Sequence, residues 1–200
     1  MKKIYITGGM GSGKSTVTHT LAAQGLPYID LDKVGHEVLK WEIVKQDLVE
    51  KFGDGILDEF GQVHRKKLAG VAFENEDATH ALNSATLPRI EQAFIEKLGE
   101  LERAGNKAVL VEYSVFKNRD VSMGNSVDVV IAVLANVHTR IERAVNAGFD
   151  KADVKRRLEQ QISDEERIAG ADVVFDNNGT LDELKTRVLD WWQTYSENLK

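Results

Sequence analysis

The 200-residue sequence predicts an α/β protein with a parallel five-stranded sheet and helices on both faces. Two observations predict this class. Short apolar runs alternate with longer helical patterns along the whole chain, and no internal repeat or low-complexity stretch interrupts the alternation. The expected strands cover residues 3–7, 28–30, 108–112, 127–134 and 173–175. The expected helices cover residues 14–24, 33–52, 68–72, 78–104, 137–147, 151–168 and 180–197.

Local sequence supports the individual elements in turn. The run Ile4-Tyr5-Ile6 is apolar and indicates the first strand, and a glycine-rich turn leads from it into the first helix. Pro88 lies in the segment 78–104, where it either kinks one long helix or separates two helices. Near the C-terminus, Trp191-Trp192 is expected to dock the last helix on the sheet.

The turn after the first strand has a recognisable pattern. Gly8 to Ser15 reads Gly-Gly-Met-Gly-Ser-Gly-Lys-Ser and fits the phosphate-binding P-loop, Gly-x-x-x-x-Gly-Lys-Ser/Thr. Such glycines let consecutive backbone N–H groups turn towards phosphates, and the next helix adds the positive end of its dipole. The alternative is a glycine-rich turn with no ligand, but the strand before it and the helix after it favour nucleotide binding. The sequence therefore predicts a sheet of the P-loop NTPase type.

Within this loop the residue types predict separate tasks. Lys14 is expected to reach the β- and γ-phosphates, and Ser15 is expected to ligate Mg²⁺. The chain is therefore expected to bind a nucleoside triphosphate with Mg²⁺. The expected nucleotide-binding residues of the loop are Gly8, Gly9, Met10, Gly11, Ser12, Gly13, Lys14, Ser15 and Thr16.

Composition argues against several other classes. The apolar content of 42% suits one domain with a sizeable core. The net charge of −6 argues against a nucleic-acid partner, because nucleic acid is itself negatively charged. Only three apolar residues lie between Lys3 and Thr7, too few for a signal peptide or a membrane span, so no membrane partner is expected. There is no cysteine, and the five histidines lack transition-metal ligand spacing. A nucleotide-dependent enzyme is expected in the cytoplasm, as a monomer or a small homo-oligomer.

Two carboxylates follow the second predicted strand. Asp30 and Asp32 should emerge at the carboxyl edge of the sheet, where ligands of such sheets bind. One carboxylate there can take the proton of an attacking hydroxyl, and a second can hold Mg²⁺-bound water. We favour Asp32 as the catalytic base and Asp30 as its support. The alternative is that one of them only caps the following helix.

The P-loop together with Asp30-Leu31-Asp32-Lys33-Val34-Gly35-His36-Glu37 resembles the dephospho-CoA kinase family. Further blocks agree in order and approximate spacing: Arg65-Lys66-Lys67-Leu68 with Phe73, Arg157-Leu158-Glu159-Gln160-Gln161, and Ala171 to Gly179. The resemblance implies transfer of the γ-phosphoryl group of ATP to the ribose 3′-hydroxyl of dephospho-CoA. It also implies acceptor-binding roles for Asp32, His36, Arg65 and Phe73, phosphate clamps at Arg143 and Arg157, and an adenine contact for Asn177.

The resemblance also implies a division of the single kinase domain. The core is expected at residues 1–32, 105–147 and 170–200, an acceptor-side helical region at 33–104, and a lid at 148–168. The lid segment carries Lys151, Lys155, Arg156, Arg157 and Arg167. A lid with these cations would close on a triphosphate and exclude water. Alternating acidic residues make an ordinary solvated helix face the competing interpretation.

Three segments depart from the family's usual pattern. Leu87 precedes Pro88 where a histidine is usual, and Asn146-Ala147-Gly148 stands where a second arginine is expected. The segment Tyr113-Ser114-Val115-Phe116-Lys117-Asn118 lacks the usual carboxylate. These changes fit either a divergent enzyme or a different acceptor.

Rival functions remain at this point. A GTPase switch is disfavoured because no Asn-Lys-x-Asp guanine-binding motif occurs. A small-molecule kinase of the nucleoside or shikimate type is a closer alternative, since Asp-x-Asp after the second strand would serve it equally well. A nucleotide-binding module without catalysis is the third possibility.

Overall fold

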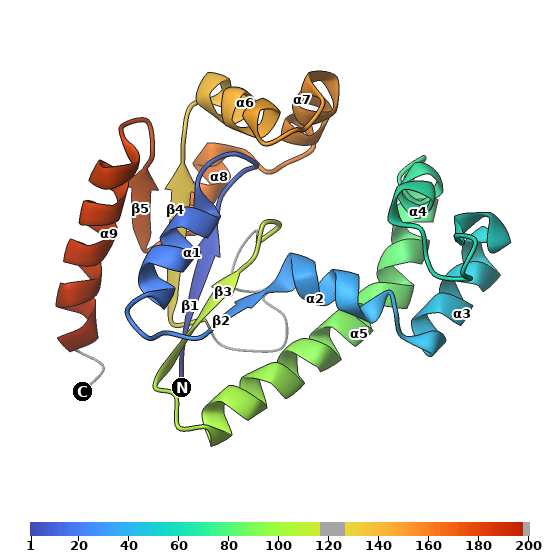
Figure 1. Ribbon diagram of the computed structural model, residues 1–200, viewed down its shortest axis with the longest axis horizontal. Coiled ribbons are helices and arrows are strands. Elements are labelled where there is room, and N and C mark those ends of the chain that lie inside the picture. Colours follow the sequence, from blue (N-terminus) through green and yellow to red (C-terminus); the bar gives the residue numbers. More distant parts are fainter. Residues whose placement is uncertain (117–126, 198–200) are drawn as a thin grey trace. The chain divides into compact units, whose positions relative to one another are not determined.

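The computed structural model describes residues 1–116 and 127–197 (Figure 1). The chain forms two compact units, one of Met1–Asp30 with Gly99–Lys200 and one of Leu31–Leu98. The first unit holds a five-stranded parallel sheet in the order β2-β3-β1-β4-β5. Its strands are β1 (Lys2–Thr7), β2 (Tyr28–Asp30), β3 (Ala108–Glu112), β4 (Val129–Leu134) and β5 (Val173–Asp176). This confirms the predicted fold class.

Helices cover both faces of this sheet. On one face, α1 (Lys14–Ala22) and α9 (Leu181–Ser196) pack on Ile4, Ile6 and neighbouring strand residues to form the main core. Successive strand residues point to opposite faces, so Tyr5 and Thr7 belong to the other face. There, α8 (Asp164–Ala169) lies against β4, and its Arg167 donates a hydrogen bond to Thr7.

Aromatic side chains pack on both faces of the sheet. Trp191 of α9 lies edge-on to Phe175 of β5 and stacks on Tyr195, with ring centroids 5.0 Å apart in the stacked pair. This agrees with the expected docking of the last helix. On the opposite face Tyr5 is fully buried beside Phe116, and burial raises the pKa of the Tyr5 hydroxyl far above its usual value.

The carboxyl edge of the sheet also carries two connected helices. These are α6 (Val137–Asn146) and α7 (Lys151–Glu159), which pack against each other (Figure 1). The predicted helix over 151–168 is in fact two helices, α7 and α8. The interruption is encoded locally, because Ser163 and Glu166 form a capping box that starts a new helix at Asp164.

The second unit is helical. Its elements are α2 (Leu31–Val38), α3 (Glu42–Phe52), η1 (Asp54–Ile56), α4 (Arg65–Ala72) and the part of α5 (Glu76–Arg103) up to Leu98. Its core is formed by Val44, Leu48, Ile56, Leu68, Ala72 and Ala85. The long helix α5 continues through Pro88 as one helix.

The prediction of a single helix over 33–52 is wrong. The structure has α2 and α3, separated at Leu39 to Trp41. Trp41 has an extended backbone, with φ −72° and ψ 132°, and its side chain packs on the core of this unit. Tertiary packing of the indole therefore overrides local helix propensity, and neither Gly nor Pro marks the break.

Candidate phosphate-binding site

A glycine-rich loop joins β1 to α1 and ends at the start of the helix. Gly13 is the residue before α1, and its φ of 103° is in the left-handed region that favours glycine. As a glycine, Gly13 has no side chain with which to cap α1. The first backbone N–H groups of α1, together with the positive end of the helix dipole, are therefore suited to bind an anion.

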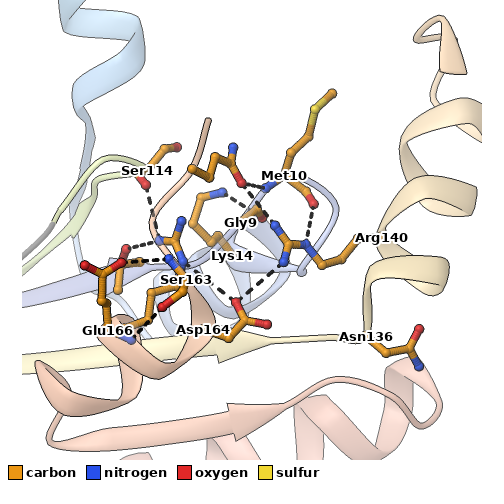
Figure 2. A network of polar contacts seen from close by, with 12 residues as sticks. Gly9, Met10, Lys14, Ser114, Asn136, Arg140, Ser163, Asp164 and Glu166 are labelled. Atoms are coloured by element: carbon orange, nitrogen blue, oxygen red, sulfur yellow. Dashed lines mark hydrogen bonds and ion pairs between the residues drawn. The ribbon is translucent and has the colours of Figure 1, made fainter. Parts of the chain in front are cut away.

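Arg140 of α6 lies directly against this loop. A Cβ atom on Gly9 would overlap the guanidinium of Arg140, so glycine at this position allows the side chain to lie close to the loop. Arg140 is 6% exposed, and its Nε donates a hydrogen bond to the Met10 carbonyl at 3.1 Å. Figure 2 shows the guanidinium of Arg140 between Met10 and Asp164. A cation is thereby held at the rim of the loop.

Gln161, in the connection between α7 and α8, contacts both the P-loop and Arg140. Its side-chain oxygen accepts a hydrogen bond from the Met10 backbone N–H at 3.0 Å and another from Arg140 Nη2 at 3.1 Å. The segment after α7 is therefore tied to the P-loop through one amide side chain.

A second guanidinium is buried nearby. Arg167 of α8 is 2% exposed, and its Nη1 donates to Thr7 Oγ1 at 3.0 Å and to the Ser114 carbonyl at 3.4 Å. Its Nε and Nη2 are buried without a hydrogen-bond partner among residues 1–116 and 127–197. Through Nη1, Arg167 connects α8 to the end of β1 and to the segment after β3.

The carboxylate of Asp164 lies near both arginines. Asp164 Oδ1 lies 3.5 Å from Arg140 Nη1 and 3.9 Å from Arg167 Nε. Burial lowers the pKa of Arg140, while Asp164 opposes that change. The pKa of Arg167 is lowered first by burial and next by the charge of Arg140. Asp164 and Glu166 both act against the lowering of the Arg167 pKa, so the two guanidiniums stay cationic beside the loop, where they can attract an anionic ligand.

A carboxylate at the end of β3 contacts the end of the loop and the first turns of α1. Glu112 is 9% exposed, and its oxygens accept hydrogen bonds from Ser15 Oγ and Thr18 Oγ1, both at 2.9 Å. Glu112 ends β3 directly opposite Asp30, the last residue of β2. A hydroxyl with one or two carboxylates, completed by phosphate oxygens and water, is the donor set that suits Mg²⁺. Among the described residues, no three His, Cys, Asp or Glu side chains gather as a metal-binding group.

The structure places the predicted phosphate-contacting residues of the first unit as follows. Lys14 starts α1, and its Nζ lies 3.5 Å from the Gly9 carbonyl. Arg143 is half-buried on α6, and its Nη1 is buried without a hydrogen bond to any described residue. Arg157 is exposed on α7, as are Lys151, Lys155 and Arg156. Of the five cations expected on the lid, only Arg167 is buried.

Asn177 follows β5 and also contacts the loop. Its side chain is 5% exposed and donates to the Ser12 carbonyl at 2.8 Å. The loop is thus held by side chains from several separate segments: Asn177 after β5, Arg140 on α6 and Gln161 after α7.

The residues expected to bind the acceptor all belong to the second unit. Asp32 is in the first turn of α2, and His36 follows four residues later on the same helix face. Arg65 begins α4 and Phe73 follows its end. All four side chains are exposed, with Phe73 at 62%. Of the departures noted in the sequence, Lys117 and Asn118 lie outside the described residues.

Sequence reasoning gave no role to three residues of this site, Glu112, Arg140 and Gln161, and it did not predict that Arg167 is buried. Two of them had usable signals. Glu112 is an acid at the carboxyl end of an otherwise apolar strand, and Arg140 precedes Arg143 by three residues, which puts both on one helix face. Gln161 belongs to a block that carries the family resemblance, but neither its contact with Met10 nor that of Arg167 with Thr7 could be read from the sequence, because each joins residues more than 150 positions apart.

Comparison with known proteins identifies the family. A sequence model described as dephospho-CoA kinase matches residues 3–183. The chain belongs to the dephospho-CoA kinase family. A dephospho-CoA kinase of Corynebacterium glutamicum is 38% identical over 190 residues, covering 94% of this chain and 96% of that protein. One from Thermobifida fusca is 35% identical over 201 residues, covering 100% and 98%.

A solved structure agrees on the fold. Dephospho-CoA kinase from Campylobacter jejuni superposes with a TM-score of 0.73 at 23% identity and covers 100% of both chains. Membership of the dephospho-CoA kinase family assigns a kinase activity with ATP as phosphoryl donor and a small-molecule acceptor. In the described part of the chain, no helix is both long enough and apolar enough to span a bilayer.

Proposed function

We propose that this chain transfers the γ-phosphoryl group of ATP to the ribose 3′-hydroxyl of dephospho-CoA, forming coenzyme A and ADP. The observation that carries the proposal is the loop of residues 8–15, which follows β1 and enters the N-terminus of α1, in a chain of this family. The guanidiniums of Arg140 and Arg167 beside that loop support a polyphosphate ligand, since guanidinium is a strong donor to phosphate oxygens.

At the nucleotide, the loop's N–H groups bind the phosphates and Lys14 neutralises charge on the β- and γ-phosphates. Ser15 would hold Mg²⁺ through its hydroxyl, and Glu112 would orient that hydroxyl or a bound water. When bound there, Mg²⁺ would offset negative charge on the transferred group.

At the acceptor, Asp32 takes the proton of the attacking 3′-hydroxyl. That oxygen forms a bond to the γ-phosphorus while the bond from the γ-phosphorus to the ADP oxygen breaks. Asp30 supports this step from the end of β2. Arg65, His36 and Phe73 bind and orient the acceptor.

The segment 148–168 acts as a lid in this proposal. Arg143 and Arg157 clamp the transferring phosphates when it closes, and closure excludes water. The buried Nη1 of Arg143, which has no hydrogen bond to a described residue, supports its assignment as an anion ligand. The ATP requirement supports a cytoplasmic location.

An acceptor panel tests the proposal. The protein is incubated with Mg²⁺ and ATP together with dephospho-CoA, shikimate or a set of nucleosides, and ADP release is measured. The proposed function requires ADP release that depends on dephospho-CoA and stays at background with the other acceptors. Faster turnover with shikimate or a nucleoside would favour another small-molecule kinase, and ATP binding without transfer would favour a nucleotide-binding module.

A further inference from the structure

The side chain of Asn177 donates a hydrogen bond to the P-loop, and the backbone of the same residue is held by the end of β4. Its Nδ2 donates to the Ser12 carbonyl at 2.8 Å, and the residue is 5% exposed. Its backbone N–H donates to the Leu134 carbonyl at 2.7 Å, which ties the end of β5 to the end of β4. The rigid sheet edge therefore sets the position of this amide.

The fit between Asn177 and the loop is close. A Cβ atom on Gly13 would overlap Asn177 Nδ2. Glycine at position 13 therefore suits the loop in two ways: its φ of 103° favours glycine, and it leaves room for the Asn177 amide. The amide packs against the Ser12–Gly13 peptide.

Peptide geometry connects this contact to phosphate binding. In a planar trans peptide the C=O and the N–H point in opposite directions. A hydrogen bond that holds the Ser12 carbonyl therefore also fixes the direction of the Gly13 N–H. That N–H lies at the start of α1, among the groups suited to bind phosphate.

We infer that Asn177 is a positioning residue of the P-loop, which orients the Ser12–Gly13 peptide so that the Gly13 N–H meets a bound phosphate. Its effect reaches the phosphates and not the adenine ring, in contrast to the adenine contact expected from the family resemblance. The inference rests on the proposed function, because it requires that the loop bind the phosphates of ATP.

The test compares a ligand with a base and a ligand without one. Calorimetry measures the dissociation constants of ATP and of inorganic tripolyphosphate, each with Mg²⁺, for the full chain and for Asn177→Ala. The inference predicts that both ligands bind about tenfold more weakly to the variant, which corresponds to about 1.4 kcal/mol. A loss for ATP with unchanged tripolyphosphate binding would overturn it in favour of an adenine contact. Unchanged binding of both ligands would overturn it as well.

Asn106 provides a matched control at the amino-terminal end of the strands. Asn106 precedes β3, and its Nδ2 donates to the Leu101 carbonyl, also at 2.8 Å. Asn106→Ala removes the same kind of hydrogen bond far along the strands from the P-loop. It should lower the melting temperature while leaving both dissociation constants unchanged. A loss of tripolyphosphate binding in this control equal to that in Asn177→Ala would reduce the effect to general destabilisation and overturn the inference.

A second variant keeps the side-chain volume. In Asn177→Asp the carboxylate has no donor and repels the Ser12 carbonyl, whereas the protonated carboxyl can donate again. Tripolyphosphate binding by this variant should therefore approach that of the unmodified chain as the pH falls. A deficit that does not change with pH would contradict the inference. Failure of the unmodified chain to bind either ligand would instead contradict the proposed function.

Discussion

The side-chain oxygen of Gln161 accepts a hydrogen bond from the backbone N–H of Met10 at 3.0 Å. The same oxygen accepts from Arg140 Nη2 at 3.1 Å. A P-loop amide and a guanidinium are the donors that a phosphate oxygen would use. Gln161 therefore uses donors for which a triphosphate would compete, and we expect ATP binding to depend on the position of the segment after α7.

Replacing Gln161→Glu should strengthen this contact and weaken ATP binding. A carboxylate would form a charge-assisted hydrogen bond with Arg140, which is about twice as strong as a neutral one. It would also repel the triphosphate. We expect a higher melting temperature without ligand and an ATP dissociation constant raised about tenfold or more. Calorimetry and thermal denaturation measure the two quantities.

The neighbouring residue provides the control. Gln160 is the exposed residue that follows α7, so Gln160→Glu introduces the same charge one position away. This variant should change neither the melting temperature nor the ATP dissociation constant strongly. If Gln161→Glu binds ATP as tightly as the unmodified chain, the proposed competition does not occur.

Glu112 should control the Mg²⁺ requirement. Its carboxylate accepts from Ser15 Oγ, and residues that orient a metal ligand typically contribute 10- to 100-fold in metal affinity. Glu112→Gln should therefore raise the Mg²⁺ concentration for half-maximal rate about tenfold or more. A titration of initial rate against Mg²⁺ measures this value.

Thr18 gives a variant for comparison with Glu112. Thr18→Val removes the other hydroxyl that Glu112 accepts from but leaves the Ser15 contact in place. It should lower stability with little change in the Mg²⁺ requirement. The role assigned to Glu112 fails if Glu112→Gln and the unmodified chain need the same Mg²⁺ concentration.

The two aspartates near β2 should differ in their effect on turnover. Asp32→Asn removes the proposed base and should lower kcat by about 10²- to 10⁴-fold, with ATP binding weakened far less. Asp30→Asn should be milder. Steady-state kinetics on both variants decide between them, and the larger loss in Asp30→Asn would reverse the assignment.

The sheet and the P-loop could be predicted because their signals are local. Apolar runs mark β1 and β3, and the loop pattern depends on glycine's backbone freedom at fixed spacing. The break between α2 and α3 could not be predicted, because it depends on where the Trp41 side chain packs. The partners of Gln161 and Arg167 were hidden for a related reason: each contact joins residues far apart in the sequence.

The most direct test of the proposed function is to identify the phosphorylated product. The protein is incubated with dephospho-CoA, ATP and Mg²⁺, and the product is analysed by phosphorus NMR and by chromatography against authentic coenzyme A. Lys14→Ala, checked by circular dichroism, is run in parallel. We predict one new phosphate monoester at the ribose 3′ position, formed with ADP and reduced at least about 10²-fold in the variant. Absence of that monoester, or equal formation by the Lys14→Ala variant, would contradict the account.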